Sequence, residues 1–310
     1  PAVYAESEDE ASTLEIELED PVIGGKLTLL YTIFEDVPVI VRSARFENEQ
    51  ETPWELNRAM SISLDLPDCR YEMLDLAGAS LRERYADFHR LHLGVQSIHS
   101  MRGHSSHQFN PFLALKRENG DENTGEVIGI SLVYSGNFLA QAEVDTMGTL
   151  RVMAGIHPEG FCWCLGKGEQ FQTPEAVLVY SDQGLNGMSQ VFHKLYRTRL
   201  ARGYWRDRER PILVNNWEAT YMKFDEQTIY GIAKKAKELG IELFVLDDGW
   251  FGKRDDDTSS LGDWTPNREK LPGGIQGIAR SVTELGMQFG LWFEPEMVSQ
   301  RSELYQAHPD

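Results

Sequence analysis

Hydrophobic and polar residues alternate in short runs through the first part of the chain. From Thr13 to about Ser181, turn residues such as Gly24-Gly25 and Asn119-Gly120-Asp121 separate one run from the next. Alternation with a period of two is typical of strands that bury one face. A succession of such strands predicts a β-sandwich over residues 1–185. The runs are TLEIELED, KLTLLYTIFED, VIVRSARFEN, SISLDLPD, GEVIGISLVYS, AQAEVD, TLRVMAGI and AVLVYS.

The period changes to that of a helix at GLNGMSQVFHKLYRTRLARG. Apolar residues there recur at helical spacing, and basic residues occupy the other face. We therefore expect a connector helix over residues 186–208. Its apolar stripe comprises Val191, Phe192, Leu195, Tyr196 and Leu200.

Strand-like and helix-like segments alternate after Pro211. The runs PILVNNW, IELFVLDDG and QFGLWFEPEM predict three strands with two amphipathic helices between them. Asp225 is expected to cap the first helix, and Gly240 and Gly286 to end the two helices. Helices that return the chain to a parallel sheet predict the first three β/α units of a (β/α)₈ barrel over residues 209–310. The helix stripes are Ile229, Ile232, Ala233, Ala236 and Leu239, then Ile275, Ile278, Val282 and Leu285.

Polar residues gather where the three predicted strands end. Asp247 and Asp248 follow the apolar run of the second strand directly, although unpaired buried carboxylates are costly. In a (β/α)₈ barrel these strand ends form the face that carries the active site. Carboxylates, amides and aromatic rings suit a sugar, which has an apolar face and many hydroxyls. The other residues of this set are Asn215, Asn216, Trp217, Glu218, Glu294 and Glu296.

Each of these residues also has a structural interpretation. Trp217 could be a core or rim aromatic residue, and Glu294 and Glu296 could form salt bridges or begin a helix. The acidic run 255–257 lies in a polar loop and is expected to be solvated. A hard cation could in principle bind the aspartate pair together with Glu296. Because no histidine is close and Trp-Phe follows the pair, we do not expect a metal.

Charge and cysteine content narrow the possible partners and location. The 310 residues include 49 acidic and 30 basic side chains, a net charge of −19 that disfavours nucleic acid and anionic membrane surfaces as partners. The start, PAVYAESEDE, is acidic where a targeting segment would be basic. Only three cysteines occur, Cys69, Cys162 and Cys164, which favours a reducing, cytoplasmic location. Cys162 and Cys164 alternate with Phe161 and Trp163, as residues of a strand do. A metal or redox role for the two thiols would need further ligands nearby.

Several long motifs resemble the α-galactosidases of glycoside hydrolase family 36. They are SSHQFNPFLAL, QTPEAVLVYSDQGLNGMSQ, RPILVNNWEATY, GIELFVLDDGWFGKRDDDTSSLGDW and GLWFEPEMVS. The resemblance implies a β-sandwich followed by a (β/α)₈ barrel and retaining hydrolysis of terminal α-galactosides such as melibiose and raffinose. It also implies no metal or other cofactor, and a homotetramer for the full-length enzyme. By motif, Asp247 and Asp248 resemble the pair that binds the 4- and 6-hydroxyls of galactose, and Trp217 resembles a wall of that pocket.

The chain also departs from the family pattern. The family's nucleophilic and acid/base aspartates follow later strands than the three expected here, so we expect no catalytic residue in this chain. The family's sandwich also begins before PAVYA, so its N-terminal part is expected to be missing. Ser80 stands where many members have a tryptophan. A non-catalytic galactoside-binding protein and a metal-dependent barrel enzyme remain the alternative hypotheses.

Overall fold

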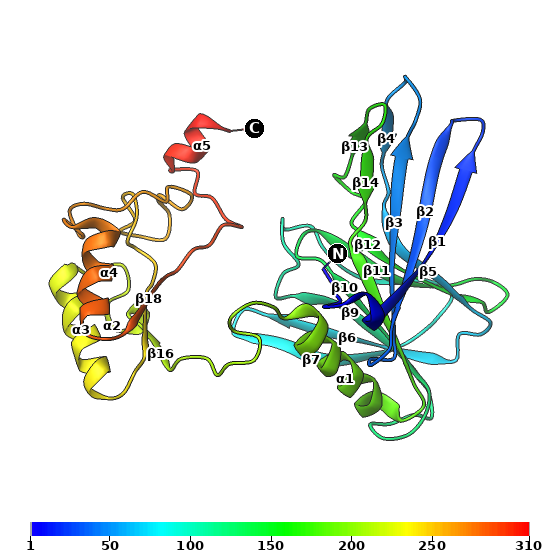
Figure 1. Cartoon of the computed structure of the whole chain (residues 1–310), viewed down its shortest axis with the longest axis horizontal. Coiled ribbons are helices and arrows are strands. Elements are labelled where there is room, and N and C mark those ends of the chain that lie inside the picture. Colours follow the sequence, from blue (N-terminus) through cyan, green and yellow to red (C-terminus); the bar gives the residue numbers. More distant parts are fainter. Residues whose placement is uncertain (1, 310) are drawn as a thin grey trace. The chain divides into compact units, whose positions relative to one another are not determined.

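The computed structural model describes residues 2–309. The chain divides into two compact units, Pro1–Arg206 and Asp207–Asp310 (Figure 1). The first unit consists mainly of antiparallel strands, and the second is a small parallel sheet with helices. No helix in the described range has the length and apolar character required to cross a membrane.

The first unit is the predicted β-sandwich. Its large sheet has nine strands, and antiparallel pairing joins each strand to its neighbours. The order is β1 (Ala11–Asp20), β2 (Gly25–Phe34), β3 (Val39–Asn48), β15 (Glu175–Ser181), β10 (Val127–Val133), β9 (Phe109–Arg117), β6 (Tyr71–Ala79) and β7 (Arg82–Arg90), with β14 (Gln170–Gln172) also paired to β3. A smaller sheet has the order β11 (Phe138–Val144), β12 (Leu150–Ile156) and β5 (Met60–Leu66), and β4 (Trp54–Leu56) pairs with β13 (Trp163–Leu165). The first unit also contains a single 3₁₀-helical turn, η1 (Glu8–Glu10), and the strand β8 (Gly94–Ser100).

The middle of the large sheet is buried on both faces. Leu113 and Leu115 of β9 pack into a core shared with the small sheet, whereas Ala114 between them belongs to the core on the opposite face. This alternation follows from the period of two in a strand. Gly129 of β10 lets a helix approach closely, because an added Cβ would lie 2.4 Å from the Met188 sulfur.

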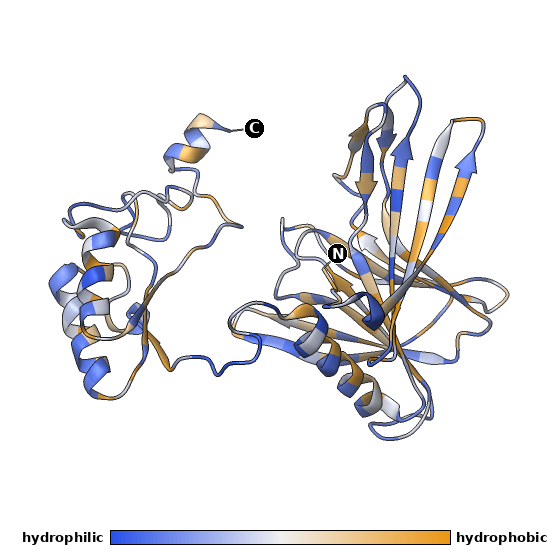
Figure 2. Ribbon diagram, viewed as in Figure 1, coloured by the Kyte–Doolittle hydropathy of each residue, from blue (hydrophilic) through white to orange (hydrophobic). Residues whose placement is uncertain are grey.

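The edge strand β1 differs from the strands in the middle of the sheet. Its hydrophobic residues alternate with polar ones as predicted, and Figure 2 shows the alternation along the ribbon. Leu14 is nevertheless 60% exposed, and Leu18 and Ile16 are exposed as well. Periodicity therefore identified the strand without identifying a buried face.

The predicted connector helix is shorter than residues 186–208. Helix α1 (Gly184–Leu195) is followed by η2 (Tyr196–Leu200), a π-helical turn. Phe192 and Leu195 of α1 are buried in the second core of the sandwich. The helix therefore packs within the first unit.

The second unit contains the three predicted parallel strands in the order β16 (Leu213–Asn215), β17 (Leu243–Leu246) and β18 (Gln288–Leu291). Its helices are α2 (Trp217–Thr220), α3 (Glu226–Glu238), α4 (Gly274–Glu284) and α5 (Glu303–Ala307). This is the start of the predicted barrel.

Local signals placed the helix ends correctly. Asp225 accepts a hydrogen bond from the Thr228 amide at 2.8 Å and caps α3. Gly240 and Gly286 follow the ends of α3 and α4 with positive φ, the conformation that glycine favours. The stripe of α3 was wrong at one residue: Leu239 is 73% exposed, because it lies at the end of the helix and beyond the surface that packs.

Candidate sugar-binding site

Asp247 and Asp248 directly follow β17, the central strand of the parallel sheet. Phe244 and Leu246 of this strand are fully buried, and the two aspartates are only 9% and 5% exposed. The sheet therefore carries two adjacent carboxylates into a poorly solvated position. Such a position requires compensating partners.

Asp247 is held by uncharged hydrogen-bond donors. Its Oδ2 accepts from Asn215 Nδ2 at 2.7 Å, and its Oδ1 accepts from the backbone amide of Asp248 at 2.8 Å. Its own amide donates to Asn216 Oδ1 at 2.9 Å. Burial raises the pKa of the Asp247 carboxyl above its usual range, and the neighbouring Asp248 charge adds to the rise. Asp247 is therefore an under-compensated acceptor, suited to a ligand that brings hydroxyl donors.

Asp248 instead forms a buried ion pair with Arg254, a residue of the loop that follows the pair. Arg254 Nη2 lies 2.9 Å from Asp248 Oδ2, and Nε lies 3.0 Å from Oδ1 and 3.2 Å from Oδ2. Arg254 is 4% exposed. The sequence pattern does not distinguish Arg254 from the neighbouring Lys253, so it offers no signal for this partner.

Trp217 begins α2 and is half-buried, with its ring edge-on to that of Tyr221. Its backbone amide donates to Asn215 Oδ1 at 3.2 Å, and the same Asn215 side chain donates to Asp247. One asparagine thus connects Trp217 to the aspartate pair.

The structure places the other predicted residues less centrally. Glu294 lies in the loop that follows β18, and Glu296 lies in a turn of that loop and is exposed. The acidic residues 255–257 are exposed, as expected for a solvated run. Trp250 and Phe251, immediately after the pair, are buried in the core of the second unit. Their side chains pack inside the second unit and do not offer a surface to a ligand.

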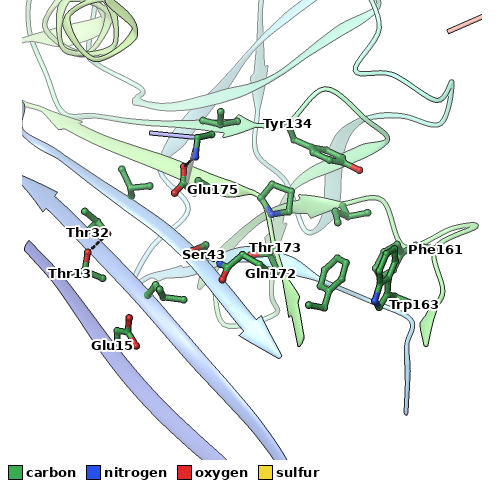
Figure 3. A pocket seen from close by; sticks show the side chains of 17 residues that line it. Thr13, Glu15, Thr32, Ser43, Tyr134, Phe161, Trp163, Gln172, Thr173 and Glu175 are labelled. Atoms are coloured by element: carbon green, nitrogen blue, oxygen red, sulfur yellow. Dashed lines mark hydrogen bonds between the residues drawn. The ribbon is translucent and has the colours of Figure 1, made fainter. Parts of the chain in front are cut away.

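A pocket of about 910 Å³ lies in the first unit and is lined only by residues of that unit. Figure 3 shows Phe161 and Trp163 at one end of it, with Thr13 and Thr32 elsewhere along its wall. Glu175 in the same pocket accepts from the backbone amides of residues 2 and 3. The pocket includes none of the predicted sugar-binding residues.

Other sequence features of the first unit are exposed. Ser80 lies in the turn between β6 and β7, and both Cys162 and Cys164 are exposed free thiols beside or within β13. Within residues 2–309, no group of three or more histidine, cysteine, aspartate or glutamate side chains is arranged to hold a metal ion.

Family models match both units. The model described as the glycosyl hydrolase family 36 N-terminal domain matches residues 1–166, more than half of the chain, and the Melibiase model matches residues 170–310. The chain belongs to glycoside hydrolase family 36.

Its relatives include characterised enzymes. The α-galactosidase AgaA of Geobacillus stearothermophilus is 62% identical over the whole chain, and α-galactosidase Mel36A of Lactobacillus acidophilus is 48% identical over the whole chain. The chain spans 42% of the length of each of these relatives. The crystal structure of AgaA matches the whole chain with a TM-score of 0.93, over 43% of its own length. Variants of AgaA have been crystallised with stachyose and with raffinose.

Proposed function

We propose that this chain is part of a retaining α-galactosidase that hydrolyses terminal α-D-galactosyl residues of oligosaccharides such as raffinose and melibiose. The observation that carries this proposal is the buried Asp247–Asp248 pair at the end of the central parallel strand. The family membership and the complexes of AgaA with raffinose and stachyose support the substrate class.

The proposed role of this chain is recognition of the galactosyl group. Asp247 and Asp248 accept hydrogen bonds from the 4- and 6-hydroxyls of galactose, and Trp217 forms a wall of the same pocket. The chemistry requires two further carboxyl groups about 5 Å apart, one as nucleophile and one as acid and base. We assign neither role to a residue of this chain.

The aspartate pair is tested by Asp247→Asn and Asp248→Asn in the protein encoded by the complete gene. A hydrogen bond to a charged group contributes roughly 1.5–3 kcal/mol, so each change should lower kcat/KM for an aryl α-galactoside by about 10- to 200-fold. Asp257→Asn, a change in an exposed aspartate of the following loop, is the matched control. The preference for galactosides over glucosides should narrow, because the 4-hydroxyl distinguishes the two sugars.

Near wild-type galactoside activity in both variants would reject the sugar-binding role. Unfolding of the variants without a selective loss of galactose preference would show that the pair is structural. Galactose binding by the complete protein without turnover would instead favour the non-catalytic binding protein.

The stereochemical course is a separate prediction. Because a retaining enzyme passes through two inversions, proton NMR of the early product should show α-galactose before mutarotation. Initial β-galactose would exclude the retaining mechanism.

We also expect a cytoplasmic homotetramer with no nucleic-acid or membrane partner. The net charge of −19 supports the absence of nucleic-acid and membrane partners, and the sparse, free cysteines support a reducing location. The homotetramer is what the family resemblance implies. Sedimentation of the purified protein would test the assembly, and cell fractionation would test the location.

A further inference from the structure

Arg254 engages both carboxylate oxygens of Asp248. The guanidinium contacts Oδ1 through Nε and Oδ2 through Nη2 and Nε, at 2.9–3.2 Å. This two-point contact restrains the plane of the carboxylate as well as compensating its charge. An exposed ion pair would contribute little, but both residues here are at most 5% exposed.

Arg254 is itself held in place on several sides. Its Nη1 donates to the carbonyl of Ser259 at 2.9 Å, and its backbone amide donates to the carbonyl of Phe251 at 3.1 Å. Its carbonyl accepts from Lys270 Nζ at 2.8 Å. The guanidinium is thus anchored by its own loop, independently of Asp248.

The two aspartates of the pair therefore differ. Asp247 has only amide donors as partners, whereas Asp248 has a fixed cation. A carboxylate has about four acceptor sites, so Asp248 can still accept from a hydroxyl while it is held by Arg254. The contact with Arg254 therefore determines how the Asp248 carboxylate is oriented toward a ligand hydroxyl.

We propose that Arg254 is a positioning residue for galactose recognition, acting through Asp248. This inference rests on the proposed function, since it assigns the orientation of one of the two galactose-binding carboxylates. Arg254 does not touch the sugar. Its effect on affinity depends entirely on the presence of the Asp248 carboxylate.

The test is a double-mutant cycle in the complete protein, read by calorimetric titration with galactose. Arg254→Gln and Asp248→Asn should each weaken galactose binding by about 10- to 100-fold, as expected for loss of a charged hydrogen bond. The double variant should bind no more weakly than Asp248→Asn alone, because Arg254 affects galactose only through the carboxylate that Asp248→Asn has already removed. Lys253→Gln removes an exposed positive charge at the adjacent position and should leave the affinity unchanged.

A conservative variant separates charge from geometry. Arg254→Lys keeps the charge but loses the planar fork, so it should recover only part of the affinity lost in Arg254→Gln. Full recovery would overturn the orientation role, and no recovery would be consistent with it.

A purely structural role gives a different result. If Arg254 only orders the loop, Arg254→Gln should weaken binding by a similar factor whether residue 248 is Asp or Asn, and that outcome would overturn the inference. If Arg254→Gln fails to fold because it leaves a buried carboxylate unpaired, comparison of the double variant with Asp248→Asn still decides the matter. Absence of galactose binding by the wild-type protein would instead reject the proposed function.

Discussion

The ammonium of Lys270 satisfies three backbone carbonyls around the loop that follows the aspartate pair. Its Nζ lies 2.8 Å from the Met222 oxygen, 3.0 Å from the Gly249 oxygen and 2.8 Å from the Arg254 oxygen. It also pairs with Asp255 at 2.9 Å. The side chain of Lys270 is 11% exposed. We predict that Lys270→Met destabilises the second unit because it removes this shared donor while retaining an apolar side chain of similar length.

The magnitude follows from the groups left without a partner. Each carbonyl that loses its donor in a poorly solvated position costs roughly 1–1.5 kcal/mol, so the three together cost about 3–4.5 kcal/mol. The pair with Asp255 adds little, because that carboxylate is 71% exposed and becomes hydrated. Lys270→Arg should lose less, since a guanidinium keeps donors in this region.

The assay is equilibrium unfolding in urea followed by tryptophan fluorescence, with limited proteolysis of the loop as a second measurement. Lys253→Met is the matched control, because Lys253 lies in the same loop and is exposed. Surface substitutions of that kind usually change stability by no more than about 0.5 kcal/mol. A Lys270→Met variant as stable as the Lys253→Met control would show that the three carbonyls find other donors and would refute the reasoning.

Two further predictions concern single positions. Gly249 has a φ of +100°, and an added Cβ would lie 2.9 Å from backbone, so Gly249→Ala should destabilise the second unit by about 1–3 kcal/mol; an unchanged urea midpoint would contradict this. In the first unit, the backbone amide of Arg70 and the guanidinium of Arg117 lower the pKa of Asp68 to about 2. Its contribution to stability is therefore present above the ordinary value near 3.8 and is lost as the pH falls toward 2. Asp68→Asn should lower the Tm at pH 7, and the difference from wild type should shrink below pH 4; a constant difference would contradict the linkage.

Much of the architecture could be predicted because it depends on local physical signals. Alternation with a period of two identified many of the strands, although β6 to β9 were not among the predicted runs, and the change to a helical period marked α1, α3 and α4. Asp225 and Gly240 could be placed at helix ends because capping involves only neighbouring backbone groups. The aspartate pair could be identified because two carboxylates directly after a buried apolar strand are costly unless they have a function or a partner.

The partners of those carboxylates required the tertiary structure. The sequence shows Arg254 and Lys270 as ordinary basic residues, and only the folded loop brings one to Asp248 and the other to three carbonyls. The burial of Trp250 likewise depends on how that loop closes over the sheet.

The sequence by itself determined the succession of a strand-rich part and three β/α units, the ends of α3 and α4 and the position of the acidic pair, since these follow from periodicity and neighbouring backbone groups. It did not reveal strands β6 to β9 or the true bounds of α1. Tertiary structure decided the order of strands in the large sheet, with β15 between β3 and β10, and the exposure of Leu14 and Leu239. It also decided that Asp248 has a cation and Asp247 has none. Pairing between distant strands and the closure of a long loop bring together residues far apart in the chain, and no local pattern records which residues will meet.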